Sequence, residues 1–140
     1  SLARIEEFLL ALTNRVANAT SGATVAMPKW FAAACSSAQS QDVFRQGSAG
    51  FIEAAGRSHE HVCRTCKAVL GLTPSEYINQ IRIDFAAQLL RTEEQSIDDV
   101  IDACGFDNSS YFYRLFKRQY GVTPRQYRLR NLHDPFQLSP

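Results

Sequence analysis

The stretch Asn108–Tyr127, NSSYFYRLFKRQYGVTPRQY, predicts a helix with two unlike faces followed by the start of a second helix. Its apolar residues recur on one side at helical spacing: Phe112, Leu115, Phe116 and Tyr120. Hydroxyl, phenol and cationic side chains occupy the other side, so one face suits a core and the other suits an external partner. Gly121 is placed to end this helix in a left-handed turn. Thr123-Pro124-Arg125-Gln126 then has the form of a capping box with proline at the first helical position.

The same pattern occurs twice along the chain. Adding 50 to the residue number relates the two copies in these pairs: Arg64 and Arg114, Lys67 and Lys117, Gly71 and Gly121, Tyr77 and Tyr127. Upstream, Phe51–Gly56 matches Val100–Gly105 one residue out of step. Two copies are too few for a solenoid. The repeat instead predicts two similar small domains, each made of a short helix, a glycine-containing turn and a longer helix.

Composition adds a charge pattern. The chain has 140 residues, and its formal net charge of +1 alone argues against a strongly basic nucleic-acid binder. The charges are segregated, however. Between Gly105 and Asn131 the only acid is Asp107, and the cations there are Arg114, Lys117, Arg118, Arg125, Arg128 and Arg130. The acids gather just upstream, at Glu93, Glu94, Asp98, Asp99 and Asp102. A dipolar surface with one basic end suits an anionic partner.

The cysteines indicate the compartment. Cys35, Cys63, Cys66 and Cys104 lie in a sequence without a secretion signal, and no apolar run approaches the roughly 18 residues of a membrane span. We therefore expect a cytoplasmic protein with reduced thiols and no membrane partner. Because the chain begins at Ser1 rather than Met, we expect it to be part of a longer protein.

We predict an all-α fold in which two helix-turn-helix subdomains are joined by a long central helix, preceded by an N-terminal helix and a linker. Residues 1–26 are expected to form an interdomain helix and linker from an upstream domain. The helix, at 2–19, belongs either to that domain or to a dimer or interdomain contact. The tandem domain spans 27–131 and the tail 132–140. Within the domain, unit one spans about 28–72, the linker helix 73–92 and unit two about 95–131.

Local signals place the helices within the units. Unit one has predicted helices from Pro28 to about Ala38, from Ser48 to Ala55, and from a cap at Ser58 to Leu70, with an irregular segment from Gln39 to Gly47. Unit two begins with a helix from Ile97 to Cys104. The central helix runs from the Thr73 capping box to about Arg91. Its two apolar stripes are Tyr77, Ile81, Phe85 and Leu89, and Ile83, Ala87 and Leu90. A helix with two apolar faces is expected to pack against both units.

A short helix, a glycine turn and a longer helix with a polar outward face are typical of a helix-turn-helix unit, whose second helix enters the major groove. A central helix of about 18 residues at a 1.5 Å rise is roughly 27 Å long. Successive major grooves on one face of a duplex lie about 34 Å apart. Two units so separated are therefore predicted to bind double-stranded DNA.

Several motifs resemble the AraC/XylS family of bacterial transcription regulators. Gly56-Arg57-Ser58, Arg64 and Gly71-Leu72-Thr73-Pro74 resemble the first helix-turn-helix of that family. Residues Cys104–Phe106, Ser110–Phe112, Arg114–Lys117 and Gly121–Arg128 resemble its carboxy-terminal signature. The resemblance covers Met27 to about Arg130. It implies a seven-helix domain that inserts two recognition helices into successive major grooves on one face of the duplex.

The resemblance also implies the wider setting. Met-Pro-Lys-Trp at Met27 resembles regulators of chitobiose or cellobiose operons, so a sugar-utilisation operon is the expected target. RNA polymerase is a second candidate partner. A small-molecule effector is expected to act only through a separate upstream domain. We expect the full-length protein to be able to dimerise and this fragment to be monomeric, with activation and repression both open.

Outward residues on the two longer helices are the predicted base contacts: His59, Glu60, Cys63, Arg64, Asn108, Ser109, Ser110, Tyr113 and Arg114. Arginine can pair bidentately with guanine, so Arg64 and Arg114 are the central candidates, with phosphate contact or salt bridging as the alternative. The predicted phosphate contacts are Ser58, Lys67, Lys117, Arg118 and Arg125. Arg82 and Arg91 are candidates for phosphate contact or for pairing with neighbouring acids. We expect Tyr77 and Tyr127 to turn their hydroxyls outward.

Two rival interpretations remain. His59, Cys63 and Cys66 lie at helical spacing and could hold zinc, or the chain could be a helical protein-interaction module. Structural zinc sites usually take ligands from at least two segments, and Cys66 matches the core position Phe116. We therefore predict no metal and no cofactor. No catalytic triad, P-loop or dinucleotide fingerprint occurs, so the chain is not predicted to be an enzyme.

Overall fold

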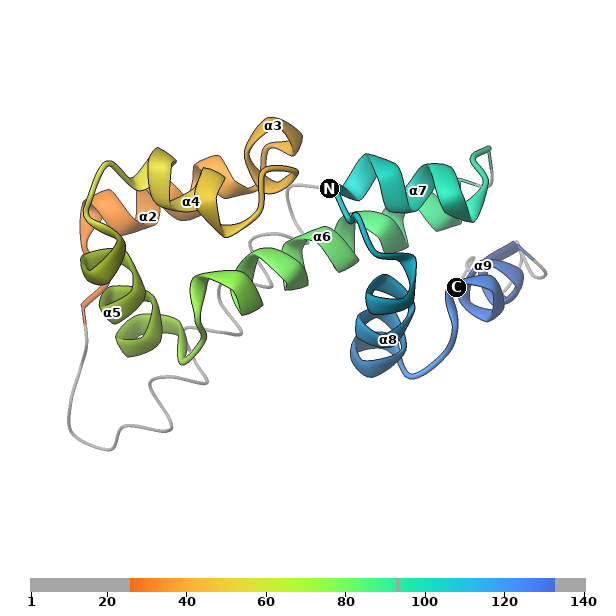
Figure 1. Cartoon of the computed structure of the whole chain (residues 1–140). Coiled ribbons are helices and arrows are strands. Elements are labelled where there is room, and N and C mark those ends of the chain that lie inside the picture. Colours follow the sequence, from red (N-terminus) through yellow and green to blue (C-terminus); the bar gives the residue numbers. More distant parts are fainter. Residues whose placement is uncertain (1–25, 93, 133–140) are drawn as a thin grey trace, which may run out of the picture.

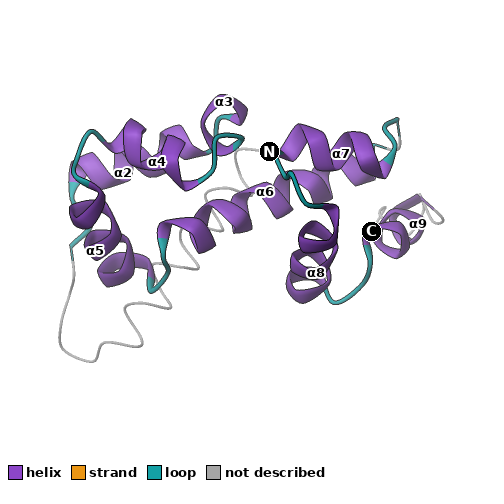
Figure 2. Ribbon diagram, in the orientation of Figure 1, coloured by secondary structure: helices purple, strands orange, loops and turns teal. Residues whose placement is uncertain are grey.

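The computed structural model describes residues 26–92 and 94–132, and every regular element in those ranges is a helix (Figures 1 and 2). The helices are α2 (Lys29–Ala38), α3 (Gln41–Phe44), α4 (Ser48–Ala55), α5 (His59–Leu70), α6 (Pro74–Arg91), α7 (Ile97–Cys104), α8 (Ser109–Tyr120) and α9 (Pro124–Leu132). The all-α prediction is confirmed. The helix predicted at 2–19, its linker and residues 133–140 of the tail lie outside the described residues.

The ends of the helices follow the capping residues of the sequence. Side-chain oxygens accept a hydrogen bond from the backbone amide three residues on at Ser58, Thr73, Ser96, Asn108 and Thr123. Both predicted capping boxes form, because the amide of Thr73 donates to Glu76 and that of Thr123 donates to Gln126. Gly71 and Gly121 end α5 and α8 with φ of 72° and 79°, a conformation that glycine adopts without steric cost.

Two hydrophobic cores share α6, one along its first half and one along its later half, so α6 packs against both units as expected. The first core joins α2, α3, α4 and α5 to Tyr77, Ile78 and Ile81 of α6. The second joins α7 and α8 to the later half of α6, with Tyr127 of α9 packed against it. Phe85 packs against both cores. The central helix is therefore shared between two small units, each too small to bury a large core alone.

The segment from Gln39 to Gly47 was predicted to be irregular, and that prediction is wrong for its middle part. Residues Gln41–Phe44 form the single-turn helix α3. Phe44 anchors this turn, because its side chain is 1% exposed and its ring centroid lies 5.0 Å from that of Phe85. Burial of one aromatic side chain thus fixes a turn that is too short to show helical periodicity.

The hydroxyl of Tyr77 was predicted to point outward, and that prediction is also wrong. Tyr77 is 0% exposed, packs against Phe51 with ring centroids 5.2 Å apart, and has its hydroxyl buried. Burial raises the pKa of this hydroxyl far above its usual value. Its repeat partner Tyr127 is only half-buried, and its hydroxyl accepts a 2.9 Å hydrogen bond from Arg91 Nε. The two copies therefore differ here in depth of packing.

Candidate nucleic-acid interface

Helices α5 and α8 project from the same side of α6, and the shorter helices α4 and α7 precede them in corresponding places (Figure 1). Each projecting helix has 12 residues, begins after a side-chain cap and ends at a left-handed glycine. Each also buries one face, through Val62 and Cys66 on α5 and through Phe112 and Phe116 on α8. Sequence positions related by the 50-residue shift are thus related in space as well.

The structure brings the predicted base contacts of unit one together. His59, Glu60, Cys63 and Arg64 line one surface hollow with Lys67 and the start of α6, Thr73 and Pro74. His59, Glu60 and Arg64 are exposed, and Cys63 is half-buried with its Sγ 3.7 Å from His59 Nδ1. This face of α5 therefore offers hydrogen-bonding groups and two cations in one place.

Two of the predicted phosphate contacts in unit one also have structural partners. Ser58 is the N-cap of α5, because its Oγ accepts a hydrogen bond from the amide of His61. Lys67 Nζ lies 3.4 Å from the carbonyl oxygen of Gly71, at the negative end of the same helix. Both side chains remain exposed, so these contacts leave them accessible to a phosphate.

The outward face of α8 carries the predicted base contacts of unit two. Four of them are exposed, namely Asn108, Ser109, Ser110 and Arg114. Tyr113 is 40% exposed, which makes it one of the most exposed large hydrophobic side chains among the described residues. Asn108 is the N-cap, since its Oδ1 accepts from the amide of Tyr111. The guanidinium of Arg114 lies 5.2 Å from the centroid of the Tyr111 ring. Arg114 therefore rests on an aromatic ring instead of extending freely.

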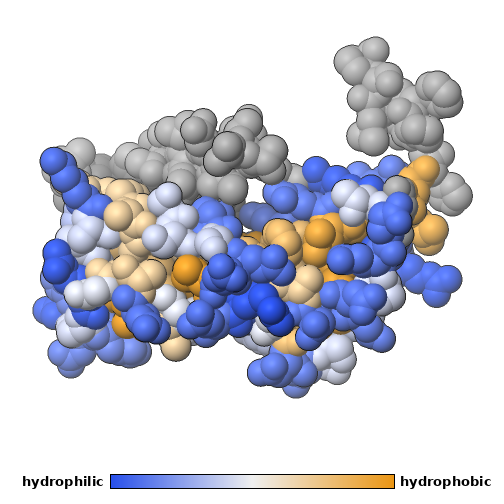
Figure 3. All heavy atoms as spheres, turned by 90° about the horizontal axis from the view of Figure 1, so that it is seen from above, coloured by the Kyte–Doolittle hydropathy of each residue, from blue (hydrophilic) through white to orange (hydrophobic). Residues whose placement is uncertain are grey.

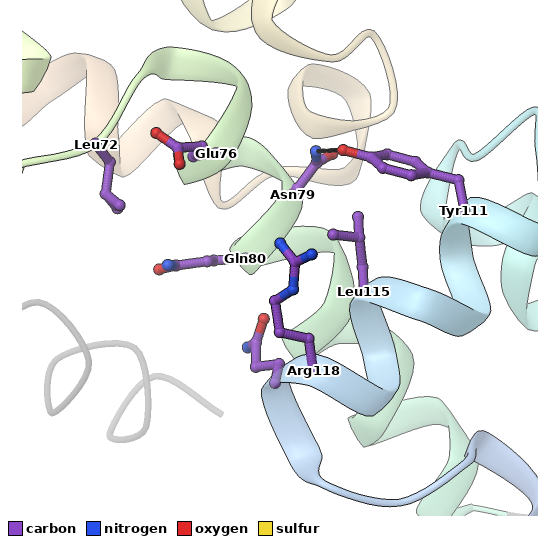
Figure 4. Close-up of a pocket in the computed structure, with 8 residues that line it drawn as sticks. Leu72, Glu76, Asn79, Gln80, Tyr111, Leu115 and Arg118 are labelled. Carbon is purple, nitrogen blue, oxygen red and sulfur yellow. Dashed lines mark hydrogen bonds between the residues drawn. The ribbon is translucent and has the colours of Figure 1, made fainter.

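Lys117, Arg118 and Arg125, the remaining predicted phosphate contacts, are all exposed. Arg118 lies in a second hollow, between α8 and α6, whose other residues include Glu76, Gln80, Leu115 and Gln119. In Figure 4 its guanidinium reaches between Gln80 and Leu115 toward the central helix. The basic side of α8 thus continues into the space between the two projecting helices.

The structure does not bring the three proposed zinc ligands together on one accessible face. Cys66 is 0% exposed within the core of unit one and does not join His59 and Cys63 on the outward face. Burial raises the pKa of its thiol to about 12, which opposes the thiolate that zinc needs. Across residues 26–92 and 94–132, no group of three or more histidine, cysteine or acidic side chains is arranged to hold a metal ion.

Sequence reasoning missed an aromatic and basic cluster beside the start of α5. Trp30 stacks on His61 with ring centroids 5.0 Å apart, and the guanidinium of Arg57 lies 5.3 Å from the Trp30 ring centroid. His61 and Arg57 are exposed. No periodicity connects α2 to the turn before α5, because these residues meet only through the tertiary fold. The arginine in the Gly56-Arg57-Ser58 turn was the only available signal.

The face seen from above, turned away from the ends of α5 and α8, is mostly hydrophilic with scattered hydrophobic spots (Figure 3). Among the described residues, no helix combines the length and the apolar character that crossing a membrane requires. Hydrophobic side chains are instead gathered in the two cores.

Two compact units with equivalent outward helices define a tandem helix-turn-helix domain. The family model described as "Helix-turn-helix domain" matches residues 51–130, more than half of the chain. The chain is also similar to solved structures. One is a transcriptional regulator of the AraC-type DNA-binding domain-containing proteins from Chromobacterium violaceum, with a TM-score of 0.65 and 25% identity over 75% of this chain and 94% of that one. Another is the C-terminal domain of AraT, a response regulator from Geobacillus stearothermophilus, with a TM-score of 0.62 and 28% identity over 73% and 85% of the two chains.

Curated relatives agree with these structures. The chain is 45% identical over 65 residues to the HTH-type transcriptional activator RhaR of Yersinia pseudotuberculosis, a match covering 46% of this chain and 22% of that protein. It is 42% identical over 65 residues to the HTH-type transcriptional activator RhaS of Escherichia coli, covering 46% and 23%. The chain therefore spans under a quarter of the length of these relatives. It belongs to the helix-turn-helix domain family of AraC/XylS-type transcription regulators.

Proposed function

We propose that this chain binds double-stranded DNA sequence-specifically by inserting α5 and α8 into successive major grooves on one face of the duplex. A single α-helix fits the major groove, and successive grooves on one face recur about every 34 Å. The observation that carries the proposal is the pair of equivalent polar and basic helix faces on the same side of α6 (Figure 1). One such face alone would be unremarkable on a helical protein.

The proposed base contacts divide between the two helices. On α5, Arg64 reads guanine, with His59, Glu60 and Cys63 beside it. On α8, Arg114 has the equivalent role, with Asn108, Ser109, Ser110 and Tyr113 around it. All of these side chains except the half-buried Cys63 are exposed, and their exposure and the support that Tyr111 gives Arg114 favour these roles. A bidentate arginine–guanine pair discriminates between bases by about 1–3 kcal/mol.

The proposed phosphate contacts are Ser58, Lys67, Lys117, Arg118 and Arg125. Four of these are exposed cations, so binding is expected to release counterions and to weaken steeply with salt. The capped starts of α5 and α8 add backbone amides that favour an anion at the same edge. Phosphate contacts at both helices would orient the domain along the duplex, and base contacts would choose the sequence.

The setting of this activity is also proposed. The relatives RhaR and RhaS are named transcriptional activators, which supports a role in transcription regulation at a promoter. A sugar-utilisation operon of the chitobiose or cellobiose type, contact with RNA polymerase, an effector acting through an upstream domain, dimerisation of the longer protein and a cytoplasmic location remain predictions of the sequence.

Titration against DNA at several salt concentrations tests the proposal. The probe is a duplex selected by this chain from a random 30-bp library, compared with a scrambled duplex of equal length. If the four cations each neutralise one phosphate, log K should fall against log salt with a slope of roughly −3 to −4. Binding without a salt slope, or equal affinity for the selected and scrambled duplexes at every salt concentration, would contradict the proposal.

A further inference from the structure

We propose that Arg82 is a positioning residue that fixes the separation and rotational phase of α5 and α8, and so sets the half-site spacing that the domain accepts. The consequence for DNA rests on the proposed function. The contacts through which Arg82 joins the two units, here called the joint, can be tested without DNA. Arg82 was a sequence candidate for phosphate contact or for pairing with acids, and the structure adds a role that neither expectation included, because Arg82 is half-buried and donates to two backbone carbonyls.

Arg82 holds the end of α3 in unit one. Its Nε donates a 2.7 Å hydrogen bond to the carbonyl oxygen of Phe44, and its Nη2 donates a 2.9 Å bond to that of Arg45. Phe44 is the last residue of α3 and Arg45 is its C-cap, so these carbonyls lie at the negative end of a helical turn. Two charge-assisted bonds from one planar group fix direction as well as distance.

The same guanidinium also contacts unit two. It lies 5.1 Å from the ring centroid of Phe106, a residue that is 8% exposed and belongs to the core of unit two. Phe106 follows Gly105 in the turn between α7 and α8. One cation therefore joins the end of α3 to the turn of the second helix-turn-helix.

Two direct contacts between the units lie beside Arg82. The side-chain amide of Gln41 on α3 donates a 2.9 Å hydrogen bond to the carbonyl oxygen of Ala103 on α7. Gly105 lies so close to Arg45 that an added Cβ would be 2.7 Å from its Cα and 2.8 Å from its carbonyl oxygen. The backbones of the two units thus touch without room for a methyl group, with Arg82 holding the joint from below.

Because of its position, a small change at this joint would move the ends of α5 and α8. In Figure 1, α3 and α7 approach one another above α6, and α5 and α8 extend below it. A change at the α3–α7 contact would pivot the units about α6 and move the ends of α5 and α8 in the opposite sense. Two recognition helices on one duplex must match it in rotation as well as distance, since a turn of DNA is about 10–10.5 bp.

Distance measurements between the two helices test the joint without DNA. Spin labels are placed on the native Cys63 and on an introduced Ser110→Cys, because Cys35, Cys66 and Cys104 are buried. We expect a narrow distance distribution in the wild type and a broader or shifted one in Arg82→Leu and in Gln41→Ala. Arg82→Lys, which keeps the charge but not the planar fork, should fall between wild type and Arg82→Leu.

Arg91→Leu is the matched control. Arg91 is on the same helix and, like Arg82, combines hydrogen bonding with a ring contact, but its one hydrogen bond and its one ring contact are both to Tyr127 within unit two. The distance distribution of Arg91→Leu should therefore equal that of the wild type. An unchanged distribution in Arg82→Leu would overturn the proposal. If Arg82→Leu does not fold by circular dichroism, the exposed Gln41→Ala decides in its place, and an unchanged distribution there overturns it equally.

Binding to spaced duplexes then tests the consequence for DNA. One or two base pairs are inserted between the half-sites of the selected duplex. Wild type and Arg91→Leu should lose about tenfold or more in affinity on insertion, because one helix loses its base contacts. Arg82→Leu should bind the original duplex more weakly but lose little more on insertion, and Arg82→Lys should recover part of the preference. If Arg82→Leu loses as much affinity on insertion as the wild type does, the proposal is overturned. If no variant binds DNA, the proposed function is contradicted, and the spin-label distances alone test whether Arg82 holds the two units together.

Discussion

The side-chain amide of Asn79 donates a 3.1 Å hydrogen bond to the hydroxyl of Tyr111, and this contact ties the central helix to α8 (Figure 4). The Tyr111 ring in turn lies beneath the guanidinium of Arg114. The arginine proposed to read a base is therefore supported by a ring whose position is set by α6. Support of this kind reduces the entropy that a long side chain loses on binding.

Removing the Tyr111 hydroxyl should destabilise the domain. Tyr111→Phe keeps the ring but leaves the half-buried Asn79 amide without its partner, so the free energy of unfolding should fall by about 1 kcal/mol. Urea unfolding followed by circular dichroism measures the change. Tyr113→Phe is the control, because the Tyr113 side chain is 40% exposed. Loss of its hydroxyl should lower the free energy of unfolding by less than about 0.5 kcal/mol. Equal losses in the two variants would show that the Asn79 contact does not stabilise the fold.

Arg114 and Lys117 should affect DNA binding in different ways. Arg114→Ala should weaken binding to the selected duplex by about 1–3 kcal/mol and to the scrambled duplex much less. Lys117→Ala should weaken both duplexes alike and reduce the salt slope by about 1. Fluorescence anisotropy on both duplexes separates the two effects. Arg45→Ala removes an exposed cation but keeps the backbone atoms that contact Arg82 and Gly105, so it should leave both affinities unchanged. The assignment of roles fails if Arg114→Ala weakens the two duplexes equally.

Gly105 and Gly121 should respond unequally to alanine. Both have positive φ, 89° and 79°, so either substitution should cost about 1–2 kcal/mol from backbone strain. At Gly105 the new methyl group would also meet the backbone of Arg45 at 2.7 Å, whereas no atom lies within 4 Å of the corresponding point at Gly121. Gly105→Ala should therefore lower the free energy of unfolding by more than Gly121→Ala. Equal losses would mean that the units do not touch at this point.

Acid should weaken one capping box and not the other. Hydrogen bonding to Thr73 lowers the pKa of the Glu76 carboxyl in the folded chain. The unfolded chain therefore binds the proton more tightly, and the stabilisation is present above the unfolded pKa and lost as pH falls through the folded one. The second box has the neutral Gln126 at the same position and cannot titrate. Glu76→Gln should remove part of the acid dependence of the unfolding free energy below about pH 4.5. An identical pH profile in wild type and Glu76→Gln would contradict this.

Much of the fold could be predicted because the signals were local and occurred twice. Capping residues act within a few residues of the chain, so they predicted the bounds of α5 and α8. The N-caps are Ser58 and Asn108, and the glycines that end the helices are Gly71 and Gly121. The repeat then separated core from surface, since Phe116 indicated that Cys66 is buried. The outward faces of both helices came from the same comparison.

The features that the sequence did not reveal depend on distant contacts. Helix α3 exists because Phe44 packs on Phe85, some forty residues away along the chain, and its single turn has no periodicity of its own. Arg82 looked like a surface cation, but its partners are backbone carbonyls, which every residue has and which leave no mark in a sequence. The buried hydroxyl of Tyr77 had no signal either, because its counterpart Tyr127 lies nearer the surface.

Methylation interference on the selected duplex tests the central claim most directly. Guanine N7 faces the major groove, so its methylation should block binding wherever a recognition helix reads that groove. We predict two groups of interfering guanines on one face of the duplex, with centres about 10–10.5 bp apart. Arg64→Ala should relieve interference in one group and Arg114→Ala in the other. A single group of interfering guanines, or two groups that both arginine variants change alike, would contradict the insertion of α5 and α8 into successive major grooves.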